Sequence, residues 1–255
     1  MLKENIFITG ASQGVGEAVA RRFAAAGAKR IALVARDESR LDRIASDLRA
    51  MDCAAIPIVA DLSKVEDCRR SVAEAEQELG PIDVICNCAG LTLRGDIFNT
   101  TEEVFNQLFA VNVRGSFFIM QSVLPAMIKS GRGGVIINIS SMLSYGGPSF
   151  LLPYSGSKGA LNVITKNVAN TVKNHRIRVH AINLGWTDTP AEHQTQTKVH
   201  GMPQDWATVE GKKQPFGRLL NADDPAKLCV FLASDEAEMM TGCIIDQEQW
   251  IAGTL

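Results

Sequence analysis

Tyr154 and Lys158 stand four residues apart, with Ser155, Gly156 and Ser157 between them. On a helix, this spacing places both side chains on one face. A tyrosine ionises near pH ~10 and is a poor base at neutral pH, but a nearby ammonium favours its phenolate. We therefore expect Lys158 to lower the pKa of Tyr154 and make it a general acid or base. A partly buried tyrosine beside an extended lysine is the structural alternative.

Two further polar side chains could join this pair. Ser141 lies thirteen residues before Tyr154, at the end of an apolar run, and its hydroxyl can hydrogen-bond a carbonyl or alcohol oxygen; Ser140 and Ser144 have the same chemistry. Asn112 interrupts an otherwise apolar helical face. A buried amide needs partners, so it is either a satisfied core amide or part of a site. The candidate catalytic set is Asn112, Ser141, Tyr154 and Lys158.

The segment Thr9–Gly16 reads TGASQGVG and lies between an apolar run and an amphipathic segment. Glycine gives the backbone both a tight turn and a close approach to phosphate. The helix that follows offers free N–H groups and a positive dipole end. A plain tight turn would look similar, but the strand before it and the helix after it favour dinucleotide binding. The predicted cofactor contacts here are Gly10, Ser12, Gln13, Gly14, Val15 and Gly16.

The end of the second apolar run bears on the choice between NAD and NADP. An acidic residue there would bind the ribose 2′-hydroxyl, whereas a nearby basic residue would favour the 2′-phosphate. Ala35 occupies the expected acidic position, and Arg36 follows it directly. Arg36 could pair with the phosphate and stack on adenine, so the sequence favours NADP. If the register differs by one or two residues, Asp37 would bind the ribose and NAD would be the cofactor. Alternatively, Arg36 is a solvent-exposed loop residue without a role in binding.

The elements that must position these residues follow from hydrophobic patterning. Short, continuous apolar runs alternate with amphipathic segments, which predicts βαβ units around a buried parallel sheet. The expected strands are 6–9, 31–35, 55–60, 82–86, 135–139, 179–183 and 244–246. The expected helices are 15–26, 41–51, 65–79, 102–130 and one that begins near Tyr154. Ligands bind at the carboxyl ends of such strands, which is where the candidate residues fall.

No repeat or linker divides the chain. We therefore predict one doubly wound α/β domain over residues 1–255, a Rossmann fold with a seven-stranded parallel sheet. Residues 187–218 form the exception, because they are polar, rich in Gln, Thr and His, and only weakly periodic. We expect this segment to be a small insertion that acts as a substrate lid.

Composition narrows the function. The chain has 26 basic and 28 acidic side chains, with 46% apolar and 21% charged residues. These values are ordinary for a globular protein and exclude disordered, collagen-like and coiled-coil chains. A net charge of −2 argues against a nucleic-acid or acidic-membrane partner. The N-terminus shows no secretory pattern, and no window approaches ~18 consecutive apolar residues, so we expect a cytoplasmic protein without a membrane span.

The cysteines and histidines do not indicate a metal site. The cysteines are spaced neither like zinc ligands nor like a disulfide framework, so we expect free thiols. The histidines also lack metal-ligand spacing. The residues concerned are Cys53, Cys68, Cys86, Cys88, Cys229, Cys243, His175, His180, His193 and His200.

Together these features resemble the short-chain dehydrogenase/reductase family, in its small single-domain subtype, over nearly the whole chain. The resemblance rests on the Thr9–Gly16 turn, Asn87-Cys88-Ala89-Gly90, Asn112, Ser141 and the segment from Tyr154 to Lys158. It implies hydride transfer between a nicotinamide and a CH–OH/C=O pair. In that reaction Tyr154 would exchange the proton and Ser141 would orient the oxygen. Lys158 would refill the proton through a water held by Asn112.

The resemblance also implies cofactor contacts and an assembly. Lys158 would hold the nicotinamide ribose, Thr189 the carboxamide, and Asp61 with Leu62 would lie at the adenine. The further implied cofactor contacts are Asn87, Ala89, Gly90, Tyr154, Gly185 and Thr187. A homotetramer or homodimer is expected, with a small carbonyl or alcohol compound as the substrate.

Two positions depart from the family pattern. Leu184 stands where a proline usually precedes the glycine at Gly185. Gln247 and Glu248 replace the paired glycines that usually follow Asp246. In family tetramers the second region lies near a subunit interface, and C-terminal residues there can reach the substrate.

The polar lid favours a hydroxylated substrate, namely a sugar, polyol or hydroxy acid. The residues that suggest it are Glu192, His193, Gln194, Gln196, His200 and Trp206. One alternative is a 3-oxoacyl thioester reductase, which would present a basic patch to an acidic carrier protein; no such patch is concentrated near the lid. Another is a non-catalytic dinucleotide sensor, which would be expected to lose Tyr154, Lys158 or Ser141.

Overall fold

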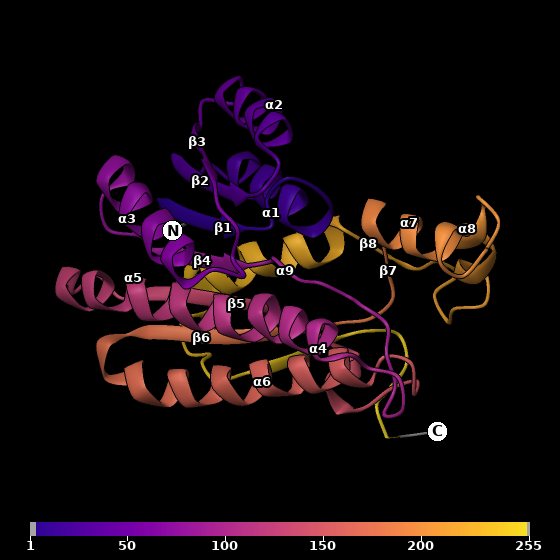
Figure 1. Cartoon of the computed structure of the whole chain (residues 1–255). Helices are drawn as coiled ribbons and strands as arrows, with labels where there is room; N and C mark the ends of the chain where they lie inside the picture. The colour runs from indigo at the N-terminus through magenta and orange to yellow at the C-terminus, as the bar shows by residue number, and fades with distance from the viewer. Residues whose placement is uncertain (1–3, 254–255) are drawn as a thin grey trace.

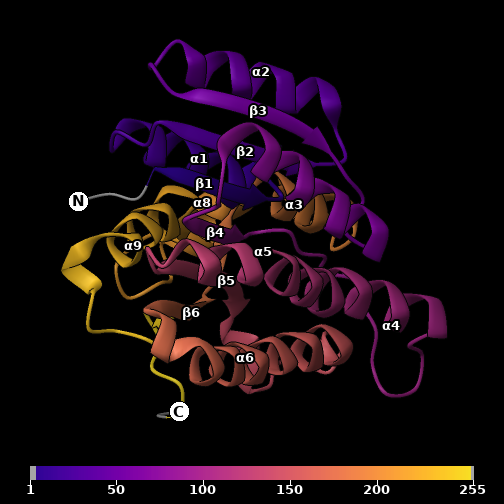
Figure 2. The same ribbon diagram turned by 90° about the vertical axis from the view of Figure 1, so that its left-hand side faces the viewer.

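In the computed structural model, which describes residues 4–253, a parallel sheet of seven strands lies between two layers of helices (Figures 1 and 2). The strand order is β3-β2-β1-β4-β5-β6-β9. The strands are β1 (Asn5–Thr9), β2 (Arg30–Ala35), β3 (Ala54–Val59), β4 (Val84–Asn87), β5 (Gly134–Ser141), β6 (Ile177–Leu184) and β9 (Ile244–Gln247). The predicted doubly wound α/β fold is thus confirmed, and each predicted strand overlaps an observed one.

The helices divide between the two faces because successive strand side chains point to opposite sides. In β1, Ile6 and Ile8 pack into the layer built by α1, α2 and α9. Phe7, between them, packs into the layer built by α3, α5 and α6. These helices are α1 (Gly14–Ala25), α2 (Glu38–Arg49), α3 (Val65–Leu79), α5 (Ser116–Ser130), α6 (Leu152–Val172) and α9 (Asp223–Ala233). Helix α9 was not predicted from the sequence.

The predicted helix over 102–130 is continuous but not uniform. It comprises α4 (Glu102–Phe109), the π-helical turn η1 (Ala110–Gly115) and α5. This 29-residue helix contains an 18-residue window with a mean hydropathy of 1.2, so by length and composition it could cross a membrane. Ile119, Val123 and Met127 are buried against the sheet, however, so this is a core helix of the fold.

The lid projects from one side of the body (Figure 1). It contains α7 (Pro190–Lys198) and α8 (Trp206–Gly211). A second sheet of two short parallel strands, β7 (Thr187–Asp188) and β8 (Leu220–Asn221), brings the two ends of this insertion together. The lid therefore has a fixed base at the carboxyl edge of the large sheet.

Candidate active site

Ser141, Tyr154 and Lys158 converge at the carboxyl end of β5. Ser141 is the last residue of β5, and α6 begins eleven residues later with Tyr154 and Lys158 in its first two turns. Ser141 and Lys158 are buried, and Tyr154 is half-buried. The Ser141 hydroxyl hydrogen-bonds the Tyr154 side chain. The structure thus brings together the three side chains that the sequence placed in one set.

The acid–base behaviour of the pair differs from the prediction. The Lys158 ammonium donates a hydrogen bond to the Ile139 carbonyl at 2.8 Å and lies 5.8 Å from the centroid of the Tyr154 ring. Burial raises the pKa of Tyr154, against hydrogen bonds from Ser141 and Thr92 that lower it. The prediction that Lys158 lowers the pKa of Tyr154 was therefore wrong, because burial raises this pKa overall and Lys158 is not among the groups that shift it.

Burial also acts on Lys158 itself. With its ammonium enclosed, the pKa of Lys158 falls to about 8. A neutral amine and an ammonium are thus both accessible near neutral pH. A group in this range can take up and release protons during turnover.

Asn112 lies in η1, directly behind Lys158. It is fully buried, accepts a hydrogen bond from the Leu91 N–H at 2.8 Å and donates to the Leu91 carbonyl and the Ser157 hydroxyl, both at 3.0 Å. A Cβ added to Gly90 would lie 3.5 Å from the Lys158 Nζ atom and 3.6 Å from the Asn112 Oδ1 atom. Asn112 is thus a satisfied amide that also borders the lysine. Single π turns of this kind are frequent at functional sites.

The glycine turn forms an open cradle beside β4. Gly10 has a φ of 65°, and a Cβ there would come within 2.8 Å of the Ala89 backbone. The Ala89 N–H in turn donates to the Thr9 hydroxyl at 3.1 Å. Helix α1 begins at Gly14, and Gln13 makes no side-chain cap, so the first N–H groups of α1 remain available. Such a helix start fits a phosphate. Ser12 and Val15 complete the turn and are half-buried.

The structure ends β2 at the residue that the sequence predicted. Ala35 is the last residue of β2, and Arg36 is exposed after it. Asp37 caps α2, where its carboxylate accepts hydrogen bonds from the Arg40 N–H at 3.1 Å and the Ser39 hydroxyl at 3.0 Å. The acidic side chain is therefore committed to the helix. Arg36 has no ion-pair partner within residues 4–253.

The turn after β3 holds the other two adenine candidates. The Asp61 carboxylate accepts from the Ser63 N–H at 3.1 Å, and the Asp61 N–H donates to Asp67 at 2.8 Å. Leu62 is buried beneath this turn. Both residues lie next to β2 in the sheet, on the same edge as Arg36.

The predicted nicotinamide end comprises the chain after β6 and the end of β4. Thr189 caps α7, and its Cβ atom lies 3.5 Å from where a Cβ on Gly14 would be. The Thr187 hydroxyl donates to the Gly185 carbonyl at 3.0 Å. At the end of β4, Asn87 donates to Asn138 at 2.9 Å, while its buried Oδ1 atom has no partner in the described part of the chain. The chain after β6 therefore comes into contact range of the glycine turn at Gly14.

The lid has its own small core. The rings of Trp186 and Trp206 stack with centroids 5.3 Å apart, and the fully buried Trp206 donates from its Nε1 atom to the His193 Nδ1 atom at 3.1 Å. Glu192 accepts from the Trp186 Nε1 atom at 2.9 Å and from the Gln196 amide at 2.6 Å. Several polar side chains expected to meet the substrate are thus bonded to one another, and Gln194 is exposed. Hydropathy alone does not distinguish these arrangements.

Two residues near Tyr154 were not predicted. The Thr92 hydroxyl hydrogen-bonds the Tyr154 side chain, and Arg94 donates from its Nη1 atom to the Thr92 carbonyl at 2.8 Å. Both lie in the loop that follows β4. Loops at the carboxyl ends of parallel strands face the ligand crevice, and this positional rule could have identified them.

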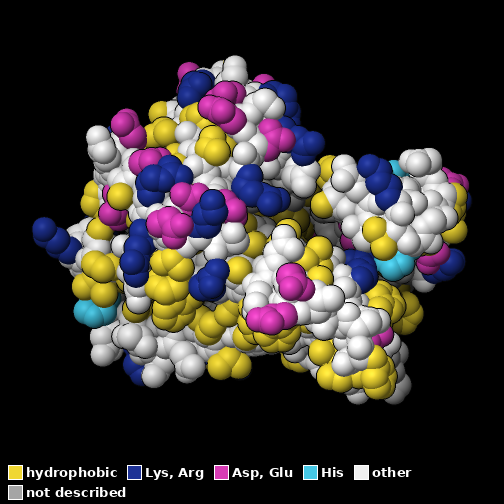
Figure 3. Space-filling view, viewed as in Figure 1, with side chains coloured by type: hydrophobic (Ala, Val, Ile, Leu, Met, Phe, Trp, Pro, Cys, Tyr) yellow, Lys and Arg dark blue, Asp and Glu magenta, His cyan; other side chains and the backbone are white. Residues whose placement is uncertain are grey.

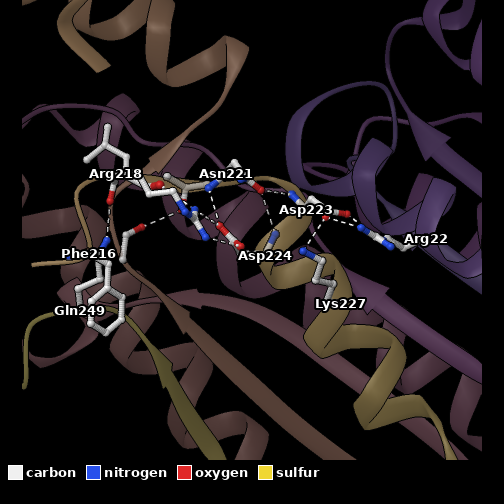
Figure 4. Close-up of polar contacts among 11 residues, drawn as sticks. Arg22, Phe216, Arg218, Asn221, Asp223, Asp224, Lys227 and Gln249 are labelled. Carbon is white, nitrogen blue, oxygen red and sulfur yellow. Dashed lines mark hydrogen bonds and ion pairs between the residues drawn. The ribbon is translucent and has the colours of Figure 1, made fainter. Parts of the chain in front are cut away.

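The C-terminal segment braces the lid where the paired glycines are missing. Glu248 accepts from the Trp186 N–H at 3.2 Å and lies against Gly185, where any Cβ would overlap its carboxylate. Gln249 accepts from the Phe216 N–H and donates to the Arg218 carbonyl, both at 2.7 Å. The contacts continue from Arg218 to Asp224 at 2.6 Å and through Asn221 to the first turn of α9 (Figure 4). Glu248 and Gln249 therefore tie the tail to the lid base.

Comparison with known proteins agrees with this geometry. The family model described as short chain dehydrogenase matches residues 4–200. Galactitol 2-dehydrogenase (L-tagatose-forming) from Cereibacter sphaeroides is 33% identical, covering 93% of this chain and 91% of its own. A variant of actinorhodin polyketide ketoreductase, solved with NADPH, superposes with a TM-score of 0.90 at 26% identity over 98% of both chains.

A further solved relative was determined with NADH instead of NADPH. The 3-ketoacyl-(acyl-carrier-protein) reductase from Brucella melitensis, complexed with NADH, has a TM-score of 0.84 at 30% identity, covering 97% of this chain and 98% of its own. The motifs, the fold and these similarities together show that the chain belongs to the short-chain dehydrogenase family of oxidoreductases.

Proposed function

We propose that this protein is a nicotinamide-dependent oxidoreductase that interconverts a secondary alcohol and a ketone. The observation that carries the proposal is the convergence of Ser141, Tyr154 and Lys158 next to Gly90, which has no side chain. A tyrosine, a hydroxyl donor and a buried lysine at one point suit proton exchange with a carbonyl or alcohol oxygen.

The cofactor would occupy the crevice from the glycine turn to Thr189. When bound, its nicotinamide ring supplies or accepts the hydride. Arg36 would bind the ribose phosphate of NADP, which we favour over NAD because Asp37 is engaged in capping α2. Asp61 and Leu62 would border the adenine. Asn87, Ala89, Gly185 and Thr187 would line the nicotinamide half.

In the reductive direction, Tyr154 gives the proton to the carbonyl oxygen. Burial keeps its pKa raised, so it stays protonated at neutral pH. Ser141 holds the same oxygen by hydrogen bonding. Lys158, whose pKa is about 8, returns a proton to the tyrosinate. Asn112 acts as a positioning residue that fixes Leu91 beside this path. Oxidation of the alcohol runs these proton steps in reverse.

We propose a sugar, polyol or hydroxy acid as the substrate. The Thr92 hydroxyl and the Glu192 carboxylate near Tyr154 support a hydroxylated molecule, and one relative acts on galactitol by name. The second candidate activity is reduction of a 3-oxoacyl thioester. It is favoured by the similarity to the Brucella reductase.

A substrate panel separates these candidates. Purified protein would be assayed with NADPH and NADH, and with the oxidised forms, against polyols, sugars, hydroxy acids, ketosteroids and 3-oxoacyl thioesters. We expect turnover with the hydroxylated compounds. Turnover confined to apolar ketones would overturn the polar-substrate proposal, and turnover confined to thioesters would establish the second candidate. Cofactor binding without any turnover would indicate a dinucleotide sensor.

We further propose a homodimer or homotetramer located in the cytoplasm. Phe105 on α4 and Phe117 on α5 are exposed apolar side chains on one long helix, and oligomerisation would cover them. The cysteines are all free thiols, which suits a reducing compartment. Light scattering on the cofactor-loaded protein tests the assembly, because a monomer at micromolar concentration would contradict it.

A further inference from the structure

Arg94 lies at the mouth of the active site with no acidic partner. It belongs to the loop after β4 and is half-buried. Its contacts are the Thr92 carbonyl, at 2.8 Å from the Nη1 atom, and the His200 Nε2 atom, at 3.2 Å from both the Nε and Nη2 atoms. None of the ion pairs within residues 4–253 includes Arg94.

This guanidinium is anchored close to the reacting position. Thr92, whose carbonyl holds Arg94, hydrogen-bonds the Tyr154 side chain through its hydroxyl. The Arg94 charge is near enough to favour the Tyr154 phenolate. A molecule whose oxygen meets Tyr154 and Ser141 therefore has Arg94 within a short distance along its chain.

The lid contacts Arg94 through one residue. His200 follows α7, accepts the two Arg94 hydrogen bonds, and places its ring 5.8 Å from that of Phe150. In the space-filling view, basic, histidine and acidic side chains all lie along the lower edge of the lid (Figure 3). The lid residue His200 thus contacts both Arg94 of the body and Phe150 before α6.

The remaining charge in the mouth does not neutralise Arg94. Glu192 is the carboxylate that acts on Tyr154, and it already accepts from Trp186 and Gln196. Histidine as an acceptor is neutral, so the Arg94 charge is uncompensated by its contacts. Arginine presents a planar fork that matches a carboxylate in a bidentate pair.

We propose that Arg94 binds a carboxylate of the substrate, so that the preferred substrate is a hydroxy acid and its oxo-acid partner. This inference rests on the proposed oxidoreductase function. A single guanidinium beside the Glu192 carboxylate suits one negative charge better than the nearly double charge of a phosphate monoester. A neutral polyol would leave Arg94 without an anionic partner in the bound complex.

Matched pairs of acids and neutral alcohols test it. Galactonate is compared with galactitol, and lactate with propylene glycol, because each pair differs in one terminal group. Turnover with the oxidised cofactor and calorimetric binding to the NADPH-loaded protein are measured for each. We expect the acid of at least one pair to have a kcat/KM about tenfold or more above that of its alcohol, with a correspondingly lower Kd.

Variants locate the effect. Arg94→Gln should weaken the acid's Kd and raise its KM by roughly 10–100-fold, while changing the alcohol by less than about threefold. Arg94→Lys should recover part of the loss, because it restores the charge without the fork. Arg43→Gln, on the outer face of α2, is the matched control and should change neither compound.

The outcomes are distinct. Alcohol turnover with no advantage for the acid in either pair, or an equal loss for both compounds in Arg94→Gln, would overturn the carboxylate inference alone. A preference for a sugar phosphate over the matching acid would overturn it in favour of a phosphate site. No turnover of any acid or alcohol would refute the proposed function and this inference together.

Discussion

Replacing Lys158 with methionine should stabilise the protein while removing its activity. Lys158 is buried, with 4% of its surface exposed. Its pKa is about 8 in the folded chain, against an ordinary value of 10.5. Between these two pH values the unfolded chain holds a proton that the folded chain has released. The free energy of unfolding therefore rises with pH across this window, and below pH 8 the buried ammonium costs the fold about 3 kcal/mol.

Methionine removes this cost but also one hydrogen bond. The Ile139 carbonyl accepts from Lys158 at 2.8 Å, and losing that donor costs about 1 kcal/mol. The net expectation is that Lys158→Met unfolds with a free energy about 2 kcal/mol higher than the wild type at pH 7. The advantage should shrink toward pH 10, where the folded wild type holds a neutral amine.

Urea unfolding of the cofactor-free protein at pH 7 and near pH 10 measures this. Lys166→Met, at an exposed position on the same helix, is the control and should change stability by less than about 0.5 kcal/mol. Turnover of Lys158→Met should fall by at least about a hundredfold, because the proton path is broken. A Lys158→Met protein less stable than the wild type at pH 7, with an unchanged pH dependence, would refute the reasoning.

Three further predictions follow from particular side chains. Arg36→Glu should weaken NADPH binding about tenfold or more and leave NADH binding within about threefold; equal effects on both, by fluorescence titration, would contradict the assignment of Arg36 to the phosphate. Burial lowers the pKa of His180 from 6.5 to about 4. The neutral imidazole therefore contributes fully to the free energy of unfolding above pH 6.5, and this contribution is lost as the pH falls toward 4. The wild type should then lose about 3 kcal/mol of unfolding free energy that His180→Leu retains in urea titrations, and equal losses would contradict this. Gln249→Ala should speed hydrogen exchange in the lid over residues 206–218, whereas the exposed control Gln77→Ala should not; unchanged exchange would show that the tail does not brace the lid.

The strands and the main cluster could be predicted because local pattern and topology agree. Continuous apolar runs specify strands buried on both faces, and the parallel order then forces Ser141 and the start of α6 to one edge of the sheet. The end of β2 could be predicted for the same reason, since Ala35 ends an apolar run. Asp37 next to it was ambiguous because a helix cap and a ribose ligand require the same side chain.

The rest depends on tertiary packing. The sign of the Tyr154 pKa shift follows from burial, which residue spacing does not encode. In the lid, Trp186 stacks on Trp206, and His193 hydrogen-bonds Trp206 instead of facing the substrate. The lid sequence has no amphipathic pattern from which this inward orientation could be predicted. Arg94 could not be predicted as a site residue because it belongs to no motif. Only the folded structure places its loop beside Tyr154.

The central claim is that Tyr154 exchanges the proton with the substrate oxygen, and cofactor consumption by Tyr154→Phe tests it most directly. Phenylalanine keeps the ring and its packing but removes the hydroxyl. We predict that the variant folds, binds NADPH within about threefold of the wild type, and loses roughly 100–10,000-fold in turnover on any compound that the wild type uses. A Tyr154→Phe protein that consumes cofactor at the wild-type rate would contradict the account.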